Sequence, residues 1–148
     1  MECIILVGLQ ASGKSTFYLN YFYKTHMRIN LDMLKKRKRE DIFLQACVDG
    51  SQRVVIDNTN PTVEERQRYI ELFKKYHFKI IGYYFEADLE SCLERNICRE
   101  GKEKIPERGI RSTLSKMVLP SYTEGFDELY TVHTKKNTIK IDRIDNEV

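Results

Sequence analysis

A segment near the amino end of the chain, from Gly8 to Thr16, has residue types and spacing that suit the binding of phosphate. It reads G-L-Q-A-S-G-K-S-T, which fits the pattern G-x-x-x-x-G-K-S/T, and it lies between an apolar strand-like run and a helical pattern. Gly8 and Gly13 allow backbone angles and a close approach that a Cβ would block. Successive backbone N–H groups then face a single anion. This context favours a phosphate loop over a chance glycine-rich turn.

Two side chains of this loop extend the same chemistry. A helix beginning near Lys14 presents the positive end of its dipole to the anion, and Lys14 itself reaches the β- and γ-phosphates of a nucleotide. The hydroxyl of Ser15 suits a place on Mg²⁺. The residues expected to bind the nucleotide are Gly8, Ala11, Ser12, Gly13, Lys14, Ser15 and Thr16. The chain has no N-K-x-D element to read guanine, so we expect ATP rather than GTP.

Asp57 follows the apolar residues 54–56 at the end of a predicted buried strand. An acidic residue at this point would lie beside the phosphate loop and hold Mg²⁺ through water. The alternative is a simple cap, because residues 57–60 contain several good capping residues. We favour the metal role for Asp57. Residues 58–60 are expected to be turn and cap residues, with Thr59 as a candidate contact to nucleotide or acceptor.

Asp32 comes just after a short strand-like piece over residues 27–30. In a doubly wound sheet, ligands bind beyond the carboxyl ends of the strands. A carboxylate there could accept the proton of an acceptor hydroxyl during phosphoryl transfer. The alternative is an N-cap for a helix over residues 33–47, which Asp also favours. The two roles are compatible, and the residues alone do not choose between them.

A basic run from Lys35 to Arg39 follows in the same predicted helix. These five consecutive cations spread over most of the helix circumference, so one or two of them would face an acceptor pocket. A phosphate-bearing acceptor would explain the cluster. The alternatives are a solvated helix face, partly neutralised by Glu40 and Asp41, and a localisation signal. The position so soon after Asp32 favours the acceptor, with Lys35 as the candidate ligand.

The segment that follows a predicted helix over residues 88–99 is rich in charge. Residues from about 99 to 110 are expected to close over bound nucleotide as a lid that excludes water. On the helix, Arg95 and Arg99 lie one turn apart on one face. An arginine beside the transferring phosphate would stabilise its charge, and we favour this role for Arg99. Surface pairing with nearby glutamates is the alternative.

Length and composition exclude several classes of protein. At 148 residues the chain is expected to be one domain, residues 1–148, too short for a two-lobed protein kinase or a (β/α)₈ barrel. Its net charge of +3 permits a phosphate-rich partner without requiring one. No apolar run approaches the ~20 residues of a membrane span. We see no signal peptide, and the four cysteines form no C-x-x-C pair, so we expect a cytoplasmic protein with reduced thiols.

The elements that must position these residues alternate between strands and helices. Strands are predicted over residues 3–7, 27–30, 53–57, 78–85, 128–133 and 138–141, and helices over 14–24, 32–47, 61–76, 88–99 and 106–119. Pro61 is expected at the first position of its helix, with Thr62-x-x-Glu65 as a capping box one turn in. Asp88 is the expected cap of the next helix. The last two strands are expected to pair as a hairpin around residues 135–137.

Together these segments resemble the 5′-hydroxyl kinase domain of the polynucleotide kinase family, found in phage and animal nucleic-acid repair enzymes. The resemblance covers about residues 1–126. It rests on Gly8-x-x-x-x-Gly13-Lys14-Ser15-Thr16, Ile29-Asn30-x-Asp32, Ile56-Asp57-Asn58-Thr59-Asn60-Pro61, and Arg95-Asn96-x-x-Arg99 followed by Ile105-Pro106. With the βαβαβ alternation it implies an α/β, three-layer P-loop kinase fold, in which a mainly parallel five-stranded sheet has helices on both faces and a small lid.

The resemblance also implies an activity, the ATP- and Mg²⁺-dependent transfer of the γ-phosphate to a 5′-OH end of DNA or RNA. It implies that Asp32 is the general base and that Arg99 contacts the nucleotide phosphates. The family often has Arg directly before the base and again three residues after it, where this chain has Leu31 and Lys35. Lys35 keeps the charge but not the planar fork of an arginine. A small-metabolite kinase similar to the zeta toxins and a non-catalytic nucleotide- or RNA-binding module are the alternatives.

Overall fold

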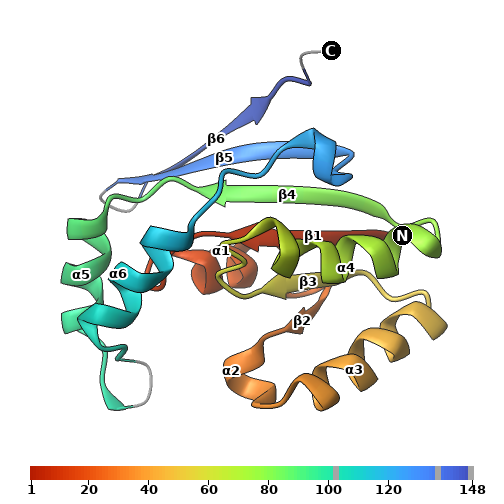
Figure 1. Ribbon diagram of the computed structural model, residues 1–148, viewed down its shortest axis with the longest axis horizontal. Helices are drawn as coiled ribbons and strands as arrows, with labels where there is room; N and C mark the ends of the chain where they lie inside the picture. The colour runs from red at the N-terminus through yellow and green to blue at the C-terminus, as the bar shows by residue number, and fades with distance from the viewer. Residues whose placement is uncertain (102–103, 136–137, 147–148) are drawn as a thin grey trace.

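The computed structural model describes residues 1–101, 104–135 and 138–146. These residues form one sheet with helices on both faces (Figure 1). The strands are β1 (Glu2–Val7), β2 (Met27–Ile29), β3 (Val54–Asp57), β4 (Lys79–Phe85), β5 (Glu128–Lys135) and β6 (Thr138–Ile144). The helices are α1 (Lys14–Tyr21), α2 (Leu31–Leu34), α3 (Arg37–Asp49), α4 (Val63–Lys75), α5 (Leu89–Ile97) and α6 (Glu107–Lys116), with a 3₁₀ turn η2 (Tyr122–Glu124) before β5.

The strand order across the sheet is β2-β3-β1-β4-β5-β6. The first five strands run parallel, and β6 pairs antiparallel with β5 as the expected hairpin. The α/β fold with a mainly parallel sheet is therefore confirmed. Within the described residues the sheet has six strands, however, so the expected number of five is wrong because β6 pairs along most of β5. The predicted turn of this hairpin includes residues 136–137, which lie outside the described part of the chain.

β1 occupies the centre of the sheet because its residues are apolar on both faces. Cys3, Ile5 and Val7 belong to the core beneath α3 and α4. Ile4 and Leu6 belong to the opposite core beneath α1. All five side chains are fully buried, as expected for a near-continuous apolar run. The segment that follows β1 is consequently held at the middle of the carboxyl edge of the sheet.

The single helix predicted over residues 32–47 is wrong. α2 ends at Leu34 because Lys35 has a φ of 72°, which a right-handed helix cannot accommodate. Lys36 is then extended, and α3 begins at Arg37. The basic run therefore does not lie on one helix. Lys35 and Lys36 form the break, and only the last three of its cations belong to α3.

Two helix starts test the predicted caps. The Thr62 side chain accepts a hydrogen bond from the Glu65 N–H at 3.2 Å, so Thr62 is the N-cap of α4. Pro61 lies before that cap, and its predicted place as the first helical residue is wrong. The cap predicted for α5 is confirmed, because Asp88 Oδ1 accepts from the Ser91 N–H at 2.7 Å.

α5 and α6 lie side by side beyond the carboxyl ends of the central strands (Figure 1). Their contact is built around Cys92 and Ile110, which are fully buried and pack with Leu9 of the loop after β1. This pair of helices therefore packs directly against the phosphate loop. None of the helices in the described ranges combines the length and apolar character needed to cross a membrane.

A buried ion pair joins α4 to the turn before β5. Arg66 donates through Nε and Nη2 to the two carboxylate oxygens of Glu124, at 2.7 and 3.1 Å, and both side chains are buried. The third guanidinium nitrogen, Nη1, donates to the carbonyl oxygen of Asn60 at 2.9 Å. Arg66 thus also anchors the segment that leads away from β3.

We predict that Arg66→Met lowers the free energy of unfolding by about 3–5 kcal/mol, because Glu124 is left as an unpaired buried charge. Urea denaturation followed by circular dichroism measures the loss. Arg111→Met is the matched control, since Arg111 pairs with Glu107 one turn away on an exposed face of α6. That variant should cost less than about 0.5 kcal/mol. Equal losses in the two variants would contradict the assignment.

Candidate active site

A cavity of about 750 Å³ opens at the carboxyl ends of β1, β2 and β3. This is the edge at which doubly wound sheets bind ligands. The predicted site residues that line it are Ala11, Gly13, Lys14, Ser15, Thr16, Asp32, Lys35, Asp57, Thr59 and Arg99. Segments that are far apart in the sequence therefore meet here. Gly8, Ser12 and Arg95, which were also predicted to bind nucleotide, are not among the residues that line the cavity.

The phosphate loop is held in shape from behind. A Cβ on Gly8 would lie 2.8 Å from the Cβ of Phe85, so no larger residue fits at that position. The Gly8 N–H donates to the carbonyl oxygen of Thr59 at 3.0 Å, which ties the loop to the segment after β3. Gly13 has a φ of 100°, which glycine adopts without strain. The two glycines thus serve close packing and backbone turning, respectively.

Lys14 is buried at the start of α1 and folds back over its own loop. Its Nζ donates to the carbonyl oxygens of Gly8 and Leu9, at 2.9 and 2.6 Å. Burial lowers the pKa of Lys14 from 10.5 to about 8, and the nearby carboxylate of Asp57 opposes that shift. A bound anion would therefore favour the charged form of Lys14.

Ser15 and Asp57 meet across the carboxyl edge of the sheet. The Ser15 hydroxyl donates to Asp57 Oδ2 at 3.0 Å, and Asp57 is only 2% exposed. Thr62 is the N-cap of α4, so the Asp57 carboxylate is not used as a cap. Asp57 lines the cavity. Hydroxyl and carboxylate oxygens are hard ligands of the kind that Mg²⁺ prefers. The pair therefore fits a magnesium ion beside bound phosphates.

Arg28 of β2 is a site residue that the sequence reasoning missed. Its Nε donates to Asp57 Oδ2 at 2.8 Å and its Nη2 donates to Ser15 Oγ at 3.1 Å. The signal that could have revealed it is an arginine inside a short strand otherwise made of Met27 and Ile29. β2 pairs with β3, so a charged residue of β2 had to lie near the end of the strand that carries Asp57.

Asp32 lies in the first turn of α2, exposed at the cavity. The N-cap of α2 is Asn30, whose side chain accepts from the Met33 N–H at 3.0 Å. The capping alternative for Asp32 is therefore wrong, and its carboxylate is not used to satisfy the helix. Asn30 also donates to the carbonyl oxygen of Asp57 at 2.6 Å, which joins α2 to the end of β3.

The basic run contributes Lys35 alone to the lining of the cavity. Lys35 is exposed, and the break after α2 places it next to the carboxyl edge of the sheet. Lys36, Lys38 and Arg39 are also exposed but do not line the cavity. Arg37 is exposed as well, and its Nη1 donates to Glu40 and to the Tyr69 hydroxyl at the contact between α3 and α4. The five cations therefore have different surroundings.

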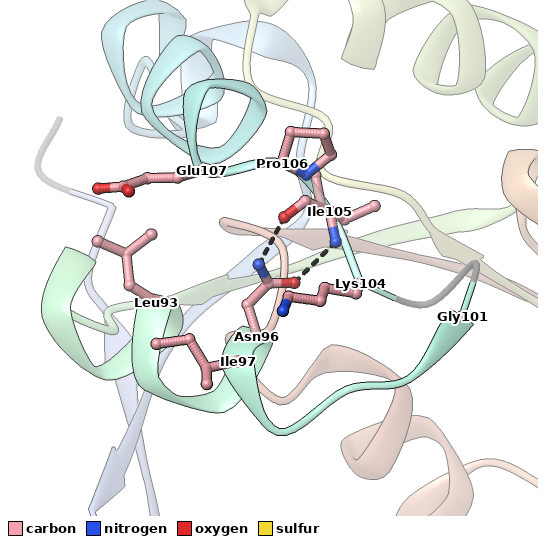
Figure 2. Close-up of a pocket in the computed structure, with 8 residues that line it drawn as sticks. All are labelled: Leu93, Asn96, Ile97, Gly101, Lys104, Ile105, Pro106 and Glu107. Carbon is pink, nitrogen blue, oxygen red and sulfur yellow. Dashed lines mark hydrogen bonds between the residues drawn. The ribbon is translucent and has the colours of Figure 1, made fainter.

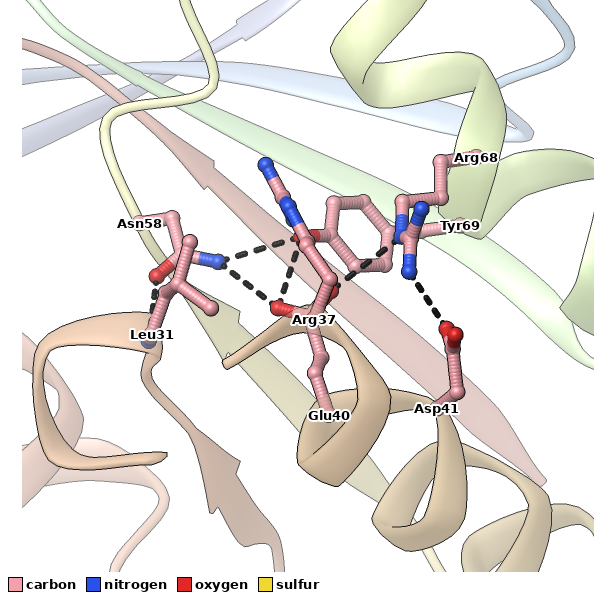
Figure 3. Close-up of polar contacts among 7 residues, drawn as sticks. All are labelled: Leu31, Arg37, Glu40, Asp41, Asn58, Arg68 and Tyr69. Carbon is pink, nitrogen blue, oxygen red and sulfur yellow. Dashed lines mark hydrogen bonds and ion pairs between the residues drawn. The ribbon is translucent and has the colours of Figure 1, made fainter. Parts of the chain in front are cut away.

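Glu40 is a fully buried carboxylate between α3 and α4 (Figure 3). Its Oε1 accepts from Arg37 at 2.9 Å and from Arg68 at 3.2 Å, and its Oε2 accepts from the Tyr69 hydroxyl at 3.0 Å. Burial, with the charge of Glu40, raises the pKa of Tyr69 to about 12, so the hydroxyl stays a donor. Two arginines thus compensate one buried charge.

Asn58 connects this buried group to the start of α2 (Figure 3). Its Oδ1 accepts from the Leu31 N–H at 2.8 Å, and its Nδ2 donates to the Tyr69 hydroxyl at 3.2 Å. Leu31 directly precedes Asp32. Asn58 is therefore more than the turn residue expected from the sequence, since it holds the backbone that carries Asp32.

The two arginines of α5 have different positions. Arg95 donates through Nη1 to the carbonyl oxygen of Ala11 at 3.2 Å and through Nη2 to the Thr134 hydroxyl at 3.4 Å. It supports the phosphate loop from outside the cavity rather than pairing along the helix surface. Arg99 lines the cavity itself. The sequence reasoning placed both near the nucleotide, and the fold separates them into a support and a lining residue.

Asn96 of α5 clamps Ile105, which lies within the predicted lid (Figure 2). Its Nδ2 donates to the carbonyl oxygen of Ile105 at 2.5 Å and its Oδ1 accepts from the Ile105 N–H at 2.8 Å. A second cavity of about 580 Å³ lies here, between α5 and α6. Ile105 lines both cavities, so the clamp fixes one wall of the site. Residues 102–103 of the predicted lid lie outside the described residues.

Comparison with protein-family models assigns the chain to a family. A family model described as an AAA domain matches residues 39–120, which is more than half of the sequence. The chain belongs to this AAA domain family. The match includes Asp57, Arg95 and Arg99 but begins after the phosphate loop. The assignment of that loop therefore rests on its sequence motif and its geometry.

Curated relatives confirm the resemblance to polynucleotide kinases. This AAA domain is 29% identical over 141 residues to the bifunctional polynucleotide phosphatase/kinase of Schizosaccharomyces pombe, covering 90% of the chain and 34% of the relative. It is 32% identical over 138 residues to a provisionally named bifunctional polynucleotide phosphatase/kinase of Acanthamoeba polyphaga mimivirus, covering 88% and 33%. The chain thus spans about a third of the length of the curated relatives it matches.

Among solved structures, a gluconokinase from Sinorhizobium meliloti aligns with a TM-score of 0.62. The alignment covers 91% of this chain and 83% of the gluconokinase, at 16% sequence identity. At that identity the likeness concerns the fold alone. This AAA domain therefore has the P-loop kinase fold and is related to polynucleotide kinase domains.

We predict that Asn58→Ala slows phosphoryl transfer by roughly tenfold or more while the Kd for nucleotide stays unchanged, because the Leu31 N–H loses its acceptor and Asp32 is displaced. Steady-state kinetics and nucleotide titration separate the two effects. Asp41→Asn is the matched control, since Asp41 pairs with Arg68 on the exposed side of the same contact. An unchanged kcat in the Asn58 variant, or an equal loss in the control, would contradict the positioning role.

Lys14 gives the site a pH dependence with a defined sign. Above pH about 8 the buried amine of the free protein is neutral, whereas bound phosphates favour its charged form. Nucleotide affinity should therefore fall as the pH rises through about 8, and binding there should take up a proton. Calorimetry in buffers of different ionisation enthalpy measures both. In Lys14→Met the affinity should be weak and lack this dependence, and an unaltered pH profile would contradict the assignment to Lys14.

Proposed function

We propose that this chain is an ATP-dependent kinase that transfers the γ-phosphate to the 5′-hydroxyl end of DNA or RNA. The observation that carries the proposal is the placement of Asp32 in the same cavity as Lys14 and the Ser15–Asp57 pair. A base, a phosphate loop and a metal-ligand pair in one cavity are what phosphoryl transfer to a hydroxyl requires. The relationship to the bifunctional polynucleotide phosphatase/kinase of Schizosaccharomyces pombe supports the choice of acceptor.

Each residue has a defined part in the proposed reaction. The Asp32 carboxylate accepts the proton of the 5′-hydroxyl as that oxygen forms a bond to the γ-phosphorus. The bond from the γ-phosphorus to the β–γ bridging oxygen breaks, and ADP leaves. Lys14 and the backbone N–H groups of the loop bind the β- and γ-phosphates, and Arg99 binds the same charge from the α5 side. Mg²⁺ held by Ser15 and Asp57 would neutralise charge on the phosphates.

The lid is part of the proposal. Residues from about 99 to 110 close over the nucleotide and exclude water, which would otherwise take the place of the acceptor hydroxyl. The clamp between Asn96 and Ile105 holds the middle of this segment against α5. Arg99 lies at its start and Ile105 lies within it, and both line the cavity.

The surroundings of Asp32 favour the end of a polymer over a small metabolite. Asp32 and Lys35 are exposed, and the neighbouring lining side chains Leu19 and Met33 are 61% and 56% exposed. Acceptor sites for small molecules bury most of their ligand. An exposed rim with a cation at Lys35 suits a strand that extends beyond the protein and carries phosphates.

Labelled ATP and a 5′-OH oligonucleotide test the proposal directly. We expect transfer by the natural chain, and a loss of about a hundredfold or more in Asp32→Ala because the general base is gone. ATP binding should persist in Asp32→Ala and be impaired together with transfer in Lys14→Ala. Asp49→Ala is the control, since Asp49 lies at the far end of α3, outside the cavity.

The same assay distinguishes the alternatives. Transfer to a metabolite and to no DNA or RNA of any length would refute the nucleic-acid acceptor in favour of a small-molecule kinase. Activity that survives in Asp32→Ala would refute the assigned base. If ATP binds but no acceptor is phosphorylated, the chain is a nucleotide-binding module and the proposed reaction is wrong.

A further inference from the structure

Arg28 holds the two oxygens that suit a metal ion. Asp57 Oδ2 accepts from Arg28 Nε at 2.8 Å and from the Ser15 hydroxyl at 3.0 Å. Ser15 Oγ in turn accepts from Arg28 Nη2 at 3.1 Å. The guanidinium thus bridges the Ser15–Asp57 pair. Its side chain is 29% exposed and lines the same cavity as the phosphate loop.

A guanidinium and a divalent cation compete for these oxygens. Arginine carries donors only, so each of its contacts uses a lone pair of Ser15 or Asp57 that is then not available to a metal ion or to water bound to it. The two cations would also lie a few ångströms apart in a partly buried site, where repulsion between charges is weakly screened. Binding of the metal is therefore disfavoured while Arg28 contacts the pair.

The fold fixes the backbone of Arg28 and leaves space into which its side chain can move. Its backbone is held by the parallel pairing of β2 with β3, in which Arg28 lies opposite Val55. Its side chain is flexible and reaches a cavity of about 750 Å³. The side chain can thus be released without moving the strand. In the absence of metal, the same guanidinium compensates the charge of Asp57, which is only 2% exposed.

From this geometry we infer that Arg28 and the divalent cation are alternative partners of the Ser15–Asp57 pair. Arg28 occupies the metal position in the metal-free protein and lowers the affinity of the site for the metal. It also places a positive charge beside the phosphate loop when no metal is present, so nucleotide can bind there without a metal. The inference rests on the proposed function only in taking Ser15 and Asp57 as the metal ligands.

The test is the coupling between metal and nucleotide, measured by calorimetry without any acceptor. The quantity is the Kd of ADP in EDTA divided by the Kd of ADP in Mg²⁺. Arg28→Met should raise this ratio by roughly five- to tenfold, because it removes the competitor of the metal and the substitute cation for the phosphates. Lys24→Met removes the same charge from an exposed position beyond the end of α1 and should leave the ratio unchanged.

A ratio in Arg28→Met equal to or below that of the natural chain would overturn the inference, as would an equal rise in Lys24→Met. Arg28→Gln keeps a polar, uncharged side chain in the strand and serves as the second variant if Arg28→Met does not fold. Since neither measurement involves an acceptor, the inference can fail while transfer to a 5′-OH end is still observed. Equally, failure of that transfer leaves the metal coupling open to measurement.

Discussion

The parallel pairing of β1 with β3 is the constraint on which the rest of the site depends. In this register Leu6 lies opposite Asp57, so the phosphate loop leaves the sheet beside the strand that ends in Asp57. The contact between the Ser15 hydroxyl and the Asp57 carboxylate follows from that register, as does the hydrogen bond from Gly8 to the backbone of Thr59. The pairing is stable because β1 is buried on both faces.

Charges that the fold buries near this edge have partners that other elements supply. Asp57 pairs with Arg28 of β2, and Glu40 pairs with Arg37 of its own helix and with Arg68 of α4. Unpaired, each carboxylate would be costly to bury. These pairs also place α2, since the group around Glu40 reaches Leu31 through Asn58. The same ionic contacts that allow burial therefore position the proposed base.

The sequence was sufficient to predict an element where the residues of one short segment determine its structure. The apolar runs predicted β1, β3 and β4, Asp88 predicted the cap of α5, and the loop motif predicted a site at the end of β1. Prediction failed where local pattern and tertiary contact disagreed. The helical pattern over residues 32–47 hid a break at Lys35, because the composition of the segment is helical on both sides of it. Directly after the break, Arg37 donates to the hydroxyl of Tyr69, which lies 32 residues further along the chain, and a local pattern does not contain such a contact.

By itself the sequence determined the α/β class, the phosphate loop and the carboxylates at the ends of β2 and β3. These features depend on the pattern of apolar residues and on motifs within short segments, which are local properties. Only the tertiary structure decided which charged groups share the cavity. In the folded chain Lys35 and Arg99 line the cavity, whereas Arg95 contacts the phosphate loop from outside it. Arg28 donates a hydrogen bond to Asp57. The physical reason is that strand order and register, which set these distances, arise from packing between segments that are remote in sequence.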